Sequence, residues 1–182
     1  MYTLHLAMVK KEYYAEIKHM HKGRYEISWE KFGSLCKELA LKIHSDFQPE
    51  CIVGISKGGL PLATVLASIF RIDLYPVRLS YREMDIGTFS SPKWSVTPTN
   101  KIKEKRVLLV DDISVSGETL RIARQEILKL GAKEVKIATL SIHTHSVKPD
   151  FYMLETDALI IHPWDKWVIK DGKFELHPEY KE

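Results

Sequence analysis

The apolar residues between positions 29 and 47 recur at spacings of three and four, which is the period of a helix with one buried face. Ser28 precedes this run, and its side chain can accept a hydrogen bond from a free backbone N–H group of the first turn. The spacing therefore predicts a helix that starts after Ser28 and buries a continuous stripe. The residues of that stripe are Trp29, Phe32, Leu35, Leu39, Ile43 and Phe47.

Two further segments have the character of helices. LPLATVLASIF, residues 60–70, is apolar almost throughout and carries Pro61 in its first turn, where a missing N–H group is tolerated. Residues 117–130 are amphipathic, and Gly131 predicts the end of that helix. The apolar face of this last segment consists of Leu120, Ala123, Ile127 and Leu130.

Short apolar runs between these helices predict strands that are buried on both faces. They cover residues 51–55, 74–80, 106–112 and 134–142. Strands that alternate with helices indicate an α/β fold with a mainly parallel, twisted sheet flanked by helices. Residues 81–105 are polar, hold two prolines and show no period, so we expect a long loop with room for a short hairpin.

Two short polar segments stand where a strand ends and a helix begins. SKGG follows the strand at 51–55, and SVSGET comes soon after the strand that ends in Asp111 and Asp112. Ligands of open parallel sheets bind outside the carboxyl ends of the strands. These two segments and the long loop therefore predict one site at that edge of the sheet.

SVSGET has the composition of an anion cradle. At a helix N-terminus the first backbone N–H groups have no partner within the helix and carry the positive end of its dipole. Ser116 and Thr119 add hydroxyl donors, and Gly117 lets a ligand approach the backbone closely. The segment is no Walker loop, because GxxxxGK[ST] is absent. Asp111 and Asp112 either meet the hydroxyl groups or the metal of a phosphorylated ligand, or they simply cap the next helix.

SKGG offers a second anion site at a helix start. Lys57 supplies a cation, and Gly58 and Gly59 expose backbone N–H groups. Such a turn is common when it stands alone. Two anion sites with a pair of acids between them suit a ligand with a phosphate at one end, hydroxyl groups in the middle and a second phosphate group at the other end.

Length and composition are those of one globular domain, with 182 residues of which 45% are hydrophobic and 28% charged. The net charge of +3 is too small to indicate nucleic acid as a partner, but it suits an anionic small molecule. No apolar run is long enough to cross a membrane, and the first residues lack the features of a secretory signal. Cys36 and Cys51 are expected to be buried thiols, and we expect a cytoplasmic protein.

Four stretches resemble the type I phosphoribosyltransferases, and in particular their 6-oxopurine (hypoxanthine and xanthine-guanine) branch. VLLVDDISVSGET matches the family's nucleotide loop, with Ser116 in the usual threonine place. GISKGG resembles the pyrophosphate loop, and SYR at 80–82 resembles the start of the flexible lid. ETDALIIHPWDKWVI resembles the hood that covers the purine. The resemblance runs from about Trp29 to Ile169.

The resemblance implies one domain over residues 1–182, with an N-terminal arm at 1–27, a core at 28–148 that contains a lid at 80–100, and a hood at 149–182. It also implies a Mg²⁺-dependent reaction in which a nucleobase nitrogen displaces pyrophosphate from C1 of 5-phosphoribosyl 1-pyrophosphate. The implied partners are these small molecules and further copies of the chain, in a homodimer or larger homo-oligomer, with no nucleic acid and no membrane.

The resemblance also implies a role for individual residues. Asp111, Asp112 and Lys57 are the catalytic residues, and the two aspartates hold the ribose hydroxyls directly or through Mg²⁺. A cis peptide bond that does not involve proline is expected at Ser56–Lys57. The 5′-phosphate is held by Ser114, Val115, Ser116, Gly117, Glu118 and Thr119, pyrophosphate is held by Ser56, Lys57, Gly58 and Gly59, the lid residues are Ser80, Tyr81 and Arg82, and the purine lies against Ile113, Val115, His143, Leu159 and Ile160.

Three of these residues depart from the 6-oxopurine branch. Val115 stands where that branch has an acid near purine N7, His143 falls where its lysine donates to O6, and Leu159 replaces an aromatic residue that stacks on the base. A neutral histidine can accept a hydrogen bond from the amino group of adenine. The departures favour adenine as substrate and AMP as product. A 6-oxopurine as the base, and a regulator that senses phosphoribosyl pyrophosphate without catalysis, are the alternatives.

His143 and His145 lie two residues apart at the end of a predicted strand, so their side chains share one face and can bind a metal. No third ligand stands at an obvious spacing, and two ordinary strand residues explain the pair as well. Trp164 and Trp167 either stack on the base or belong to the core of the hood.

Overall fold

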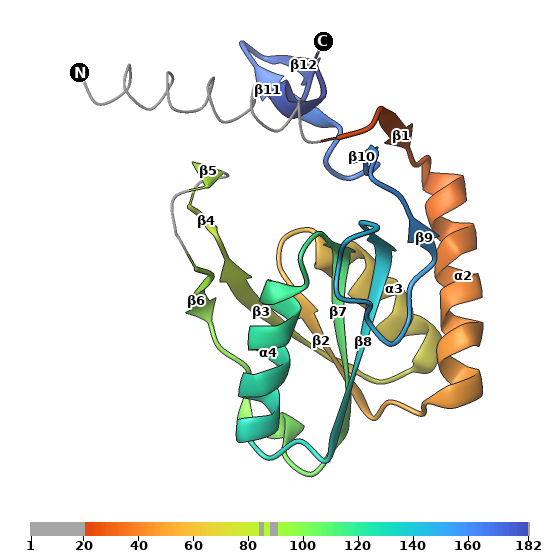
Figure 1. The fold of residues 1–182 in the computed structure, drawn as a ribbon, viewed down its shortest axis with the longest axis vertical. Helices are drawn as coiled ribbons and strands as arrows, with labels where there is room; N and C mark the ends of the chain where they lie inside the picture. The colour runs from red at the N-terminus through yellow and green to blue at the C-terminus, as the bar shows by residue number, and fades with distance from the viewer. Residues whose placement is uncertain (1–20, 84–85, 88–90, 182) are drawn as a thin grey trace.

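The computed structural model describes residues 21–83, 86–87 and 91–181, and the statements below concern those residues. Its centre is a six-stranded sheet in the order β6-β3-β2-β7-β8-β9 (Figure 1). Within this sheet β3, β2, β7, β8 and β9 run parallel to one another, and β6 pairs with β3 at the edge in the antiparallel sense. The predicted α/β fold is therefore confirmed. The strands of this sheet are β2 (Cys51–Ile55), β3 (Asp73–Ser80), β6 (Lys93–Val96), β7 (Arg106–Ser114), β8 (Glu134–Ile142) and β9 (Leu154–Glu155).

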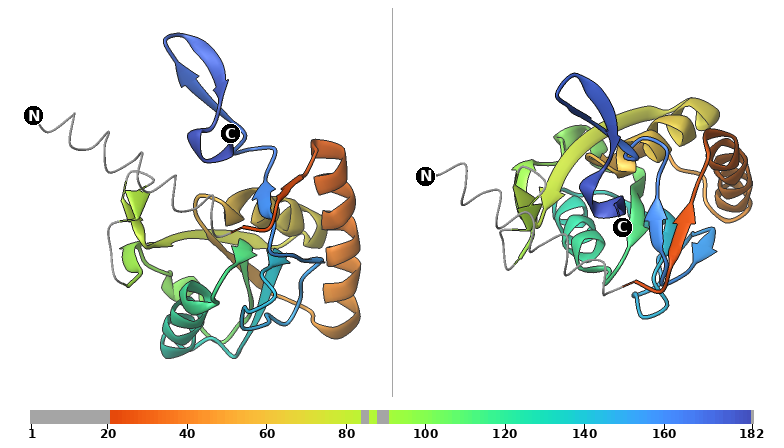
Figure 2. Two further views of the ribbon diagram at one scale, coloured as in Figure 1. Left: turned by 45° about the horizontal axis from the view of Figure 1, so that its top comes forward. Right: turned by 90° about the horizontal axis from the view of Figure 1, so that it is seen from above.

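Helices cover both faces of the sheet (Figure 2). α2 (Trp29–Asp46) and α3 (Gly59–Phe70) lie on one face, and α4 (Glu118–Lys129) lies on the other. Side chains alternate between the two faces of a strand. In β7, Leu108 and Val110 accordingly pack with α2 and α3, whereas Val107 and Leu109 pack with α4. Burial on both faces explains why the strands read as nearly continuous apolar runs.

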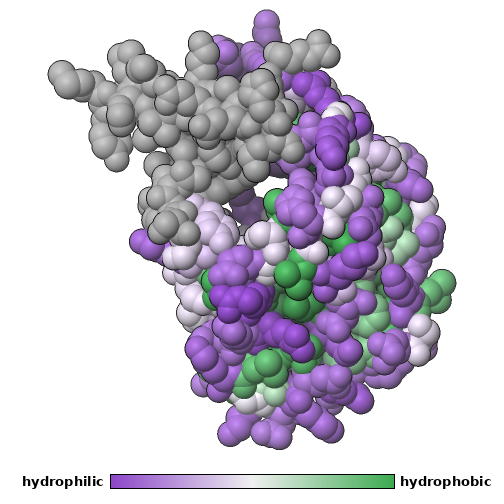
Figure 3. Space-filling view, in the orientation of Figure 1, coloured by the Kyte–Doolittle hydropathy of each residue, from purple (hydrophilic) through white to green (hydrophobic). Residues whose placement is uncertain are grey.

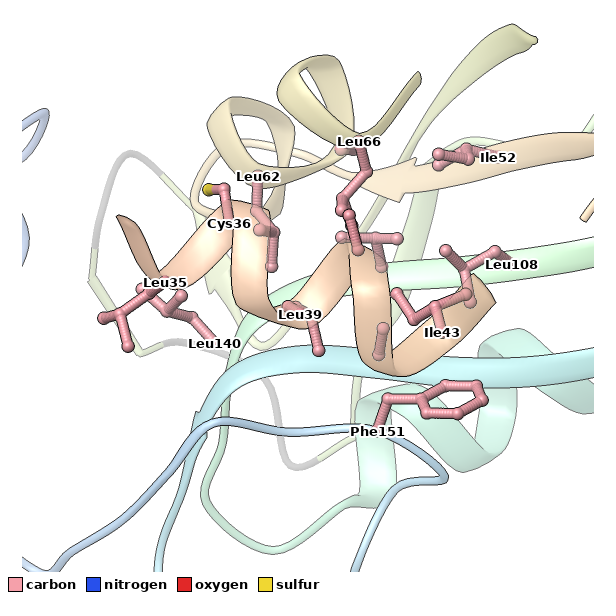
Figure 4. Packing of buried hydrophobic residues seen from close by; sticks show 14 of the residues in the cluster. Leu35, Cys36, Leu39, Ile43, Ile52, Leu62, Leu66, Leu108, Leu140 and Phe151 are labelled. Carbon is pink, nitrogen blue, oxygen red and sulfur yellow. The ribbon is translucent and has the colours of Figure 1, made fainter. Parts of the chain in front are cut away.

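Helix α2 begins where the sequence pattern predicts. The Ser28 hydroxyl accepts a hydrogen bond from the Lys31 N–H group at 3.1 Å and caps the first turn. Leu39 and Ile43 lie among the side chains that fill the space between this helix and the sheet (Figure 4). Trp29 differs from the prediction: it is 58% exposed, because the first turn of the helix places it beside the ring of Trp164 and not over the sheet.

Strand β7 runs two residues farther than the sequence pattern predicts. Its pairing with β8 continues through Asp111–Thr139 to Ser114–Ile142, so Asp111 and Asp112 lie within the strand and not at its last position. Helix α4 then begins at Glu118, with Gly117 as its N-cap. The other predicted helices and strands agree with the structure within one residue at either end.

The segment between β3 and β7 contains more regular structure than the expected loop. β4 (Arg82–Glu83) and β5 (Ile86–Gly87) pair in the antiparallel sense and form the short hairpin that the sequence allowed for. η1 (Asn100–Ile102) follows β6 and buries Ile102 on the α4 side of the sheet. Residues 84–85 and 88–90 of the expected lid lie outside the described residues.

The C-terminal segment forms a small layer over the carboxyl ends of the strands (Figures 1 and 2). β10 (Leu159–Ile161) pairs in parallel with β1 (Arg24–Glu26), and β11 (Trp167–Lys170) forms a hairpin with β12 (Lys173–Leu176). η2 (Pro178–Tyr180) packs Tyr180 against this layer. Most of the expected N-terminal arm, residues 1–20, lies outside the described residues, but β1 joins the C-terminal layer.

The surface in Figure 3 is mainly hydrophilic, and the two cysteines are buried, as the sequence predicted for them. Hydrophilic residues predominate on the face that Figure 3 shows, with smaller apolar patches between them. Among the helices that the structure describes, none combines the length and the apolar character needed to cross a membrane. Cys36 and Cys51 are buried free thiols, as predicted, and burial raises the pKa of the Cys51 thiol to about 11.

Leu39 and Leu41 of α2 offer a matched test of the buried face. Leu39 is fully buried, whereas Leu41 is 71% exposed. We expect Leu39→Ala to lower the free energy of unfolding by about 2–5 kcal/mol, because it removes buried methyl groups and leaves a cavity. Leu41→Ala should change it by less than about 0.5 kcal/mol. Urea denaturation measures both effects, and equal losses would contradict this orientation of the helix.

Candidate active site

A pocket opens at the carboxyl ends of β2, β3 and β7, beneath the C-terminal layer. Its volume is about 430 Å³, which lies within the range of about 300–1,000 Å³ for ligand pockets. The two loops that the sequence placed at one edge of the sheet meet here with the end of β3. The lining residues from these elements are Ile55, Ser56, Lys57, Gly58, Arg78, Leu79, Ser80, Tyr81, Asp111, Asp112, Ile113 and Thr119.

Asp111 and Asp112 line this pocket from the end of β7. The Asp112 N–H group donates to Asp111 Oδ1 at 3.0 Å, and the Ile113 N–H group donates to Asp112 Oδ1 at 2.8 Å. These bonds fix both carboxyl groups beside the strand. Burial, followed by the negative charge of Asp112, raises the pKa of the Asp111 carboxyl well above its usual range.

The Gly58–Gly59 turn lies directly against this pair of acids. A Cβ atom on Gly58 would lie 2.1 Å from Asp112 Oδ2, and one on Gly59 would lie 2.7 Å from the Cα atom of Asp111. Both distances are too short for a real Cβ atom. The two positions therefore require glycine, because any side chain would push the turn away from the carboxyl groups.

The residues before these glycines complete the turn. The Ser56–Lys57 peptide bond is cis, as the sequence resemblance implied. Lys57 is exposed and lines the pocket. Helix α3 begins at Gly59, with Gly58 as its N-cap, so the N–H groups of these two glycines have no partner within the helix. The next N–H group, that of Leu60, donates to the Lys57 carbonyl at 3.2 Å and closes the turn. A cation and backbone N–H donors thus stand next to two carboxyl groups.

The second loop, residues 114–119, leads into the N-terminus of α4. Gly117 adopts a left-handed backbone with φ of +84°, which glycine allows without strain. The Glu118 N–H group donates to Ser116 Oγ at 3.3 Å. The Ser114 hydroxyl is buried and shares a hydrogen bond of 2.7 Å with the Ser146 hydroxyl, so it anchors the loop from the inside.

Several residues expected in the site lie outside the lining of the pocket. Val115 is 41% exposed on the loop, whereas His143 and Leu159 are buried, with 3% and 8% exposure. Of the five residues expected to face a purine, Ile113 lines the pocket. The side chain of Arg82 lies outside the described part of the chain. The other expected residues that do not line the pocket are Gly59, Ser114, Ser116, Gly117, Glu118 and Ile160.

The C-terminal layer contributes pocket residues that the sequence did not single out. Asp165, His177 and Glu179 line the pocket together with Trp164, which also packs against the core. The Tyr180 hydroxyl donates to Asp165 Oδ2 at 3.0 Å and fixes that carboxylate. The PWD element was visible in the sequence, but no local pattern indicated that the last turn of the chain returns to the ends of the strands.

His162 is another residue that sequence reasoning missed. It is 5% exposed, and its ring stacks on that of Trp164 with centroids 4.6 Å apart. Its Nδ1 atom lies 4.0 Å from Asp112 Oδ2. Burial lowers the pKa of this imidazole, although the charge of Asp112 acts in the opposite direction. A mostly neutral ring therefore borders the acid pair.

The acid pair has the donor set of a site for a hard divalent cation. Carboxylate oxygens are the ligands that Mg²⁺ prefers in proteins. The raised pKa of Asp111 reflects in part the repulsion between two neighbouring negative charges, which a cation relieves. Asp111 and Asp112 therefore fit the Mg²⁺ that the sequence resemblance implied.

Comparison with known families agrees with this geometry. The model of the phosphoribosyl transferase domain matches residues 28–171, which is well over half of the chain. The chain belongs to the phosphoribosyltransferase family. The predicted resemblance to the purine enzymes of this family is also confirmed.

Relatives of this phosphoribosyltransferase carry several names. A purine phosphoribosyltransferase of Pyrococcus horikoshii has a similar structure, with a TM-score of 0.71, 30% identity and coverage of 82% of this chain and 99% of that one. The hypoxanthine-guanine phosphoribosyltransferase of Bacillus subtilis is 30% identical over 149 residues, which are 74% of this chain and 80% of the relative.

Other relatives carry different names. The orotate phosphoribosyltransferase of Methanocorpusculum labreanum is 25% identical over 129 residues, 71% of this chain and 70% of the relative. The transcriptional regulator GfcR of Methanosphaera stadtmanae is 29% identical over 126 residues, 64% of this chain and 61% of the relative. These relatives share the domain but differ in the activity that their names give.

Gly59 provides a test of the packing in this phosphoribosyltransferase. We expect Gly59→Ala to lower the free energy of unfolding by about 1–3 kcal/mol, because the new Cβ overlaps the backbone of Asp111. Gly33→Ala adds the same atom in α2 where nothing lies within 4 Å. It should raise the free energy of unfolding by up to about 1 kcal/mol, since alanine favours a helix. Denaturant unfolding compares the two, and equal stability would show that the turn does not contact the acids as described.

Proposed function

We propose that this phosphoribosyltransferase transfers the 5-phosphoribosyl group from phosphoribosyl pyrophosphate to a purine, and that the purine is adenine. The observation that supports the first part is the contact between the glycine turn and the acid pair within one pocket. Two anion-binding ends with carboxyl groups between them match the 5′-phosphate, the ribose and the pyrophosphate of that substrate.

In this reaction different residues bind different groups of the substrate. A nitrogen of the base bonds to C1 of the ribose and the base releases a proton to water or to the leaving pyrophosphate, while the C1–O bond breaks and its electron pair leaves with pyrophosphate. Lys57 and the N–H groups at Gly58 and Gly59 bind the leaving pyrophosphate and balance its growing charge. Asp111 and Asp112 accept hydrogen bonds from the ribose hydroxyls and orient C1 toward the base.

The rest of the pocket positions the substrate and keeps water away. Residues 114–119, of which Thr119 lines the pocket, hold the 5′-phosphate at the N-terminus of α4 beside it. Ser80 and Tyr81, which line the pocket from the end of β3, exclude water from the reacting centre. Mg²⁺ supplies charge neutralisation of the pyrophosphate when it is bound, and Asp111 and Asp112 hold it directly or through water molecules.

The preference for adenine rests on two positions. Residue 115 is a valine, so this position supplies no carboxylate for N7 of a purine, unlike the acid of the 6-oxopurine branch. Residue 143 is a histidine in place of a lysine, and burial is the main reason that the pKa of its imidazole is lowered. A neutral ring at position 143 supplies no fixed cationic donor for the O6 atom of a 6-oxopurine, where the 6-oxopurine branch has its lysine.

Other activities have specific support from the relatives. The hypoxanthine-guanine and orotate enzymes among them favour another base. The GfcR relative favours a regulator that binds phosphoribosyl pyrophosphate without turning it over, and the valine at 115 is compatible with lost catalysis.

One assay separates these activities. The full chain is incubated with phosphoribosyl pyrophosphate, Mg²⁺ and, in parallel, adenine, hypoxanthine, guanine, xanthine or orotate, and nucleotide formation is followed by chromatography. We expect AMP, with kcat/KM at least about 10-fold higher for adenine than for any other base. Turnover of another base in preference to adenine would overturn the choice of base. Tight binding of phosphoribosyl pyrophosphate without any turnover would overturn the enzymatic proposal and support the regulator.

Val115→Asp tests the base preference directly in the same assay. A carboxylate at this position can accept the proton of a 6-oxopurine at N7, so we expect kcat/KM for hypoxanthine or guanine to rise by about 10-fold or more. Ile69→Asp is the control, because Ile69 is 45% exposed on α3 and Val115 is 41% exposed. An unchanged base preference in both variants would show that residue 115 does not select the base.

A further inference from the structure

Two histidines from one segment and an aspartate from another lie close together beside the C-terminal layer. His143 and His145 follow β8, and Asp157 lies in the turn between β9 and β10. Each offers one possible ligand atom, and these atoms all lie within 4.8 Å of one another. The fold thus supplies the third ligand that the spacing of the His-x-His pair did not reveal in the sequence.

His143 gives an independent reason to expect a ligand here. The residue is 3% exposed, and its Nε2 atom is buried without a hydrogen-bond partner. An unsatisfied buried polar atom is costly, and buried side-chain nitrogens in proteins usually have a partner. Among the three side chains, His143 is buried, Asp157 is half-buried and already pairs with Thr144 and Lys22, and His145 is exposed. A metal ion in this cluster would give the buried His143 ring a partner that the described chain does not provide.

The surroundings of the cluster resemble the support that metal ligands require. The Asp157 carboxylate accepts hydrogen bonds from the Thr144 N–H group at 3.0 Å and from the Thr144 hydroxyl at 2.8 Å, which fix its orientation. The rings of His143 and His145 meet edge to face, with centroids 5.5 Å apart. A third imidazole, that of His21, packs against His143 at 5.2 Å, and its Nδ1 atom is also buried without a partner.

We propose that His143, His145 and Asp157 form a binding site for a divalent transition metal, with Zn²⁺ as the ion they suit best. Imidazole nitrogens with one carboxylate oxygen are a common zinc ligand set, whereas Mg²⁺ prefers oxygen ligands alone. Ligands about 2.0–2.2 Å from a tetrahedral ion stand roughly 3.5 Å apart. Ion binding would require side-chain rotations that bring these atoms from within 4.8 Å to that spacing. His145 is exposed, so the ion can reach the site from solvent.

The position of this site joins two functional parts of the chain. The backbone N–H group of His143 donates to the Ser114 carbonyl at 2.9 Å, where the phosphate-binding loop begins. The Asp157 carbonyl accepts from the Lys22 N–H group at 2.9 Å, where the paired strands β1 and β10 begin. A bound ion therefore fastens the base of the C-terminal layer to the loop at the end of β7.

Metal binding by the full, untagged chain tests this proposal. Zn²⁺ affinity is measured by competition with a chromogenic chelator in a buffer that contains Mg²⁺, and Co²⁺ is added separately to record its visible spectrum. We expect one Zn²⁺ per chain and a Co²⁺ spectrum typical of tetrahedral coordination. His145→Asn and Asp157→Asn should each weaken Zn²⁺ binding by at least about 10-fold.

Two control variants make the result specific. His44→Asn removes an exposed histidine on α2 and should leave Zn²⁺ affinity unchanged. Asp112→Asn alters the acid pair of the pocket and should also retain the Zn²⁺ site. Circular dichroism confirms that each variant is folded. Wild-type affinity in folded His145→Asn and Asp157→Asn, or loss of the ion in Asp112→Asn, would overturn the proposal.

Discussion

The close contact between a glycine turn and two strand-end aspartates is the constraint on which the rest of this site depends. Gly58 and Gly59 have no side chain, so the turn can lie where a Cβ atom would overlap Asp111 and Asp112. This contact brings anion donors and carboxyl groups into one pocket. It also accounts for the buried, charged surroundings that raise the pKa of Asp111.

The parallel sheet makes that contact possible. β2 and β7 are neighbours, so the turn after one strand and the acids near the end of the other emerge at the same edge. Helices on both faces hold the strands in register through two apolar clusters. A functional site of this kind keeps repelling carboxyl groups together at a cost in stability, which the large apolar core offsets.

Much of this arrangement follows from the sequence, because the signals are local. The apolar runs at 51–55 and 134–142 match β2 and β8, and the helix after Ser28 starts where its cap predicts. The loop residues of the site follow from their positions after strands. The family resemblance carried by 107–119 then indicates the activity more sharply than any pattern of apolar residues.

The remainder depends on contacts between distant parts of the chain. His162 lies 4.0 Å from Asp112, and Asp157 meets His143 and His145, yet no spacing in the sequence connects them. Glu179 lines the pocket from the last turn of the described chain for the same reason. The burial of His143 likewise follows from packing around the end of β8, which propensity and periodicity do not report.

The most direct test of the central claim is the steady-state kinetics of Asp112→Asn beside Asp46→Asn. Asp46 ends α2 at an exposed position, so its variant controls for the loss of one carboxylate. If Asp112 holds the ribose or its Mg²⁺, Asp112→Asn should lower kcat/KM for phosphoribosyl pyrophosphate by about 100-fold or more, with the fold intact by circular dichroism. Asp46→Asn should behave as the wild type. Equal kinetics in the two variants would contradict the assignment of the acid pair as the centre of the site.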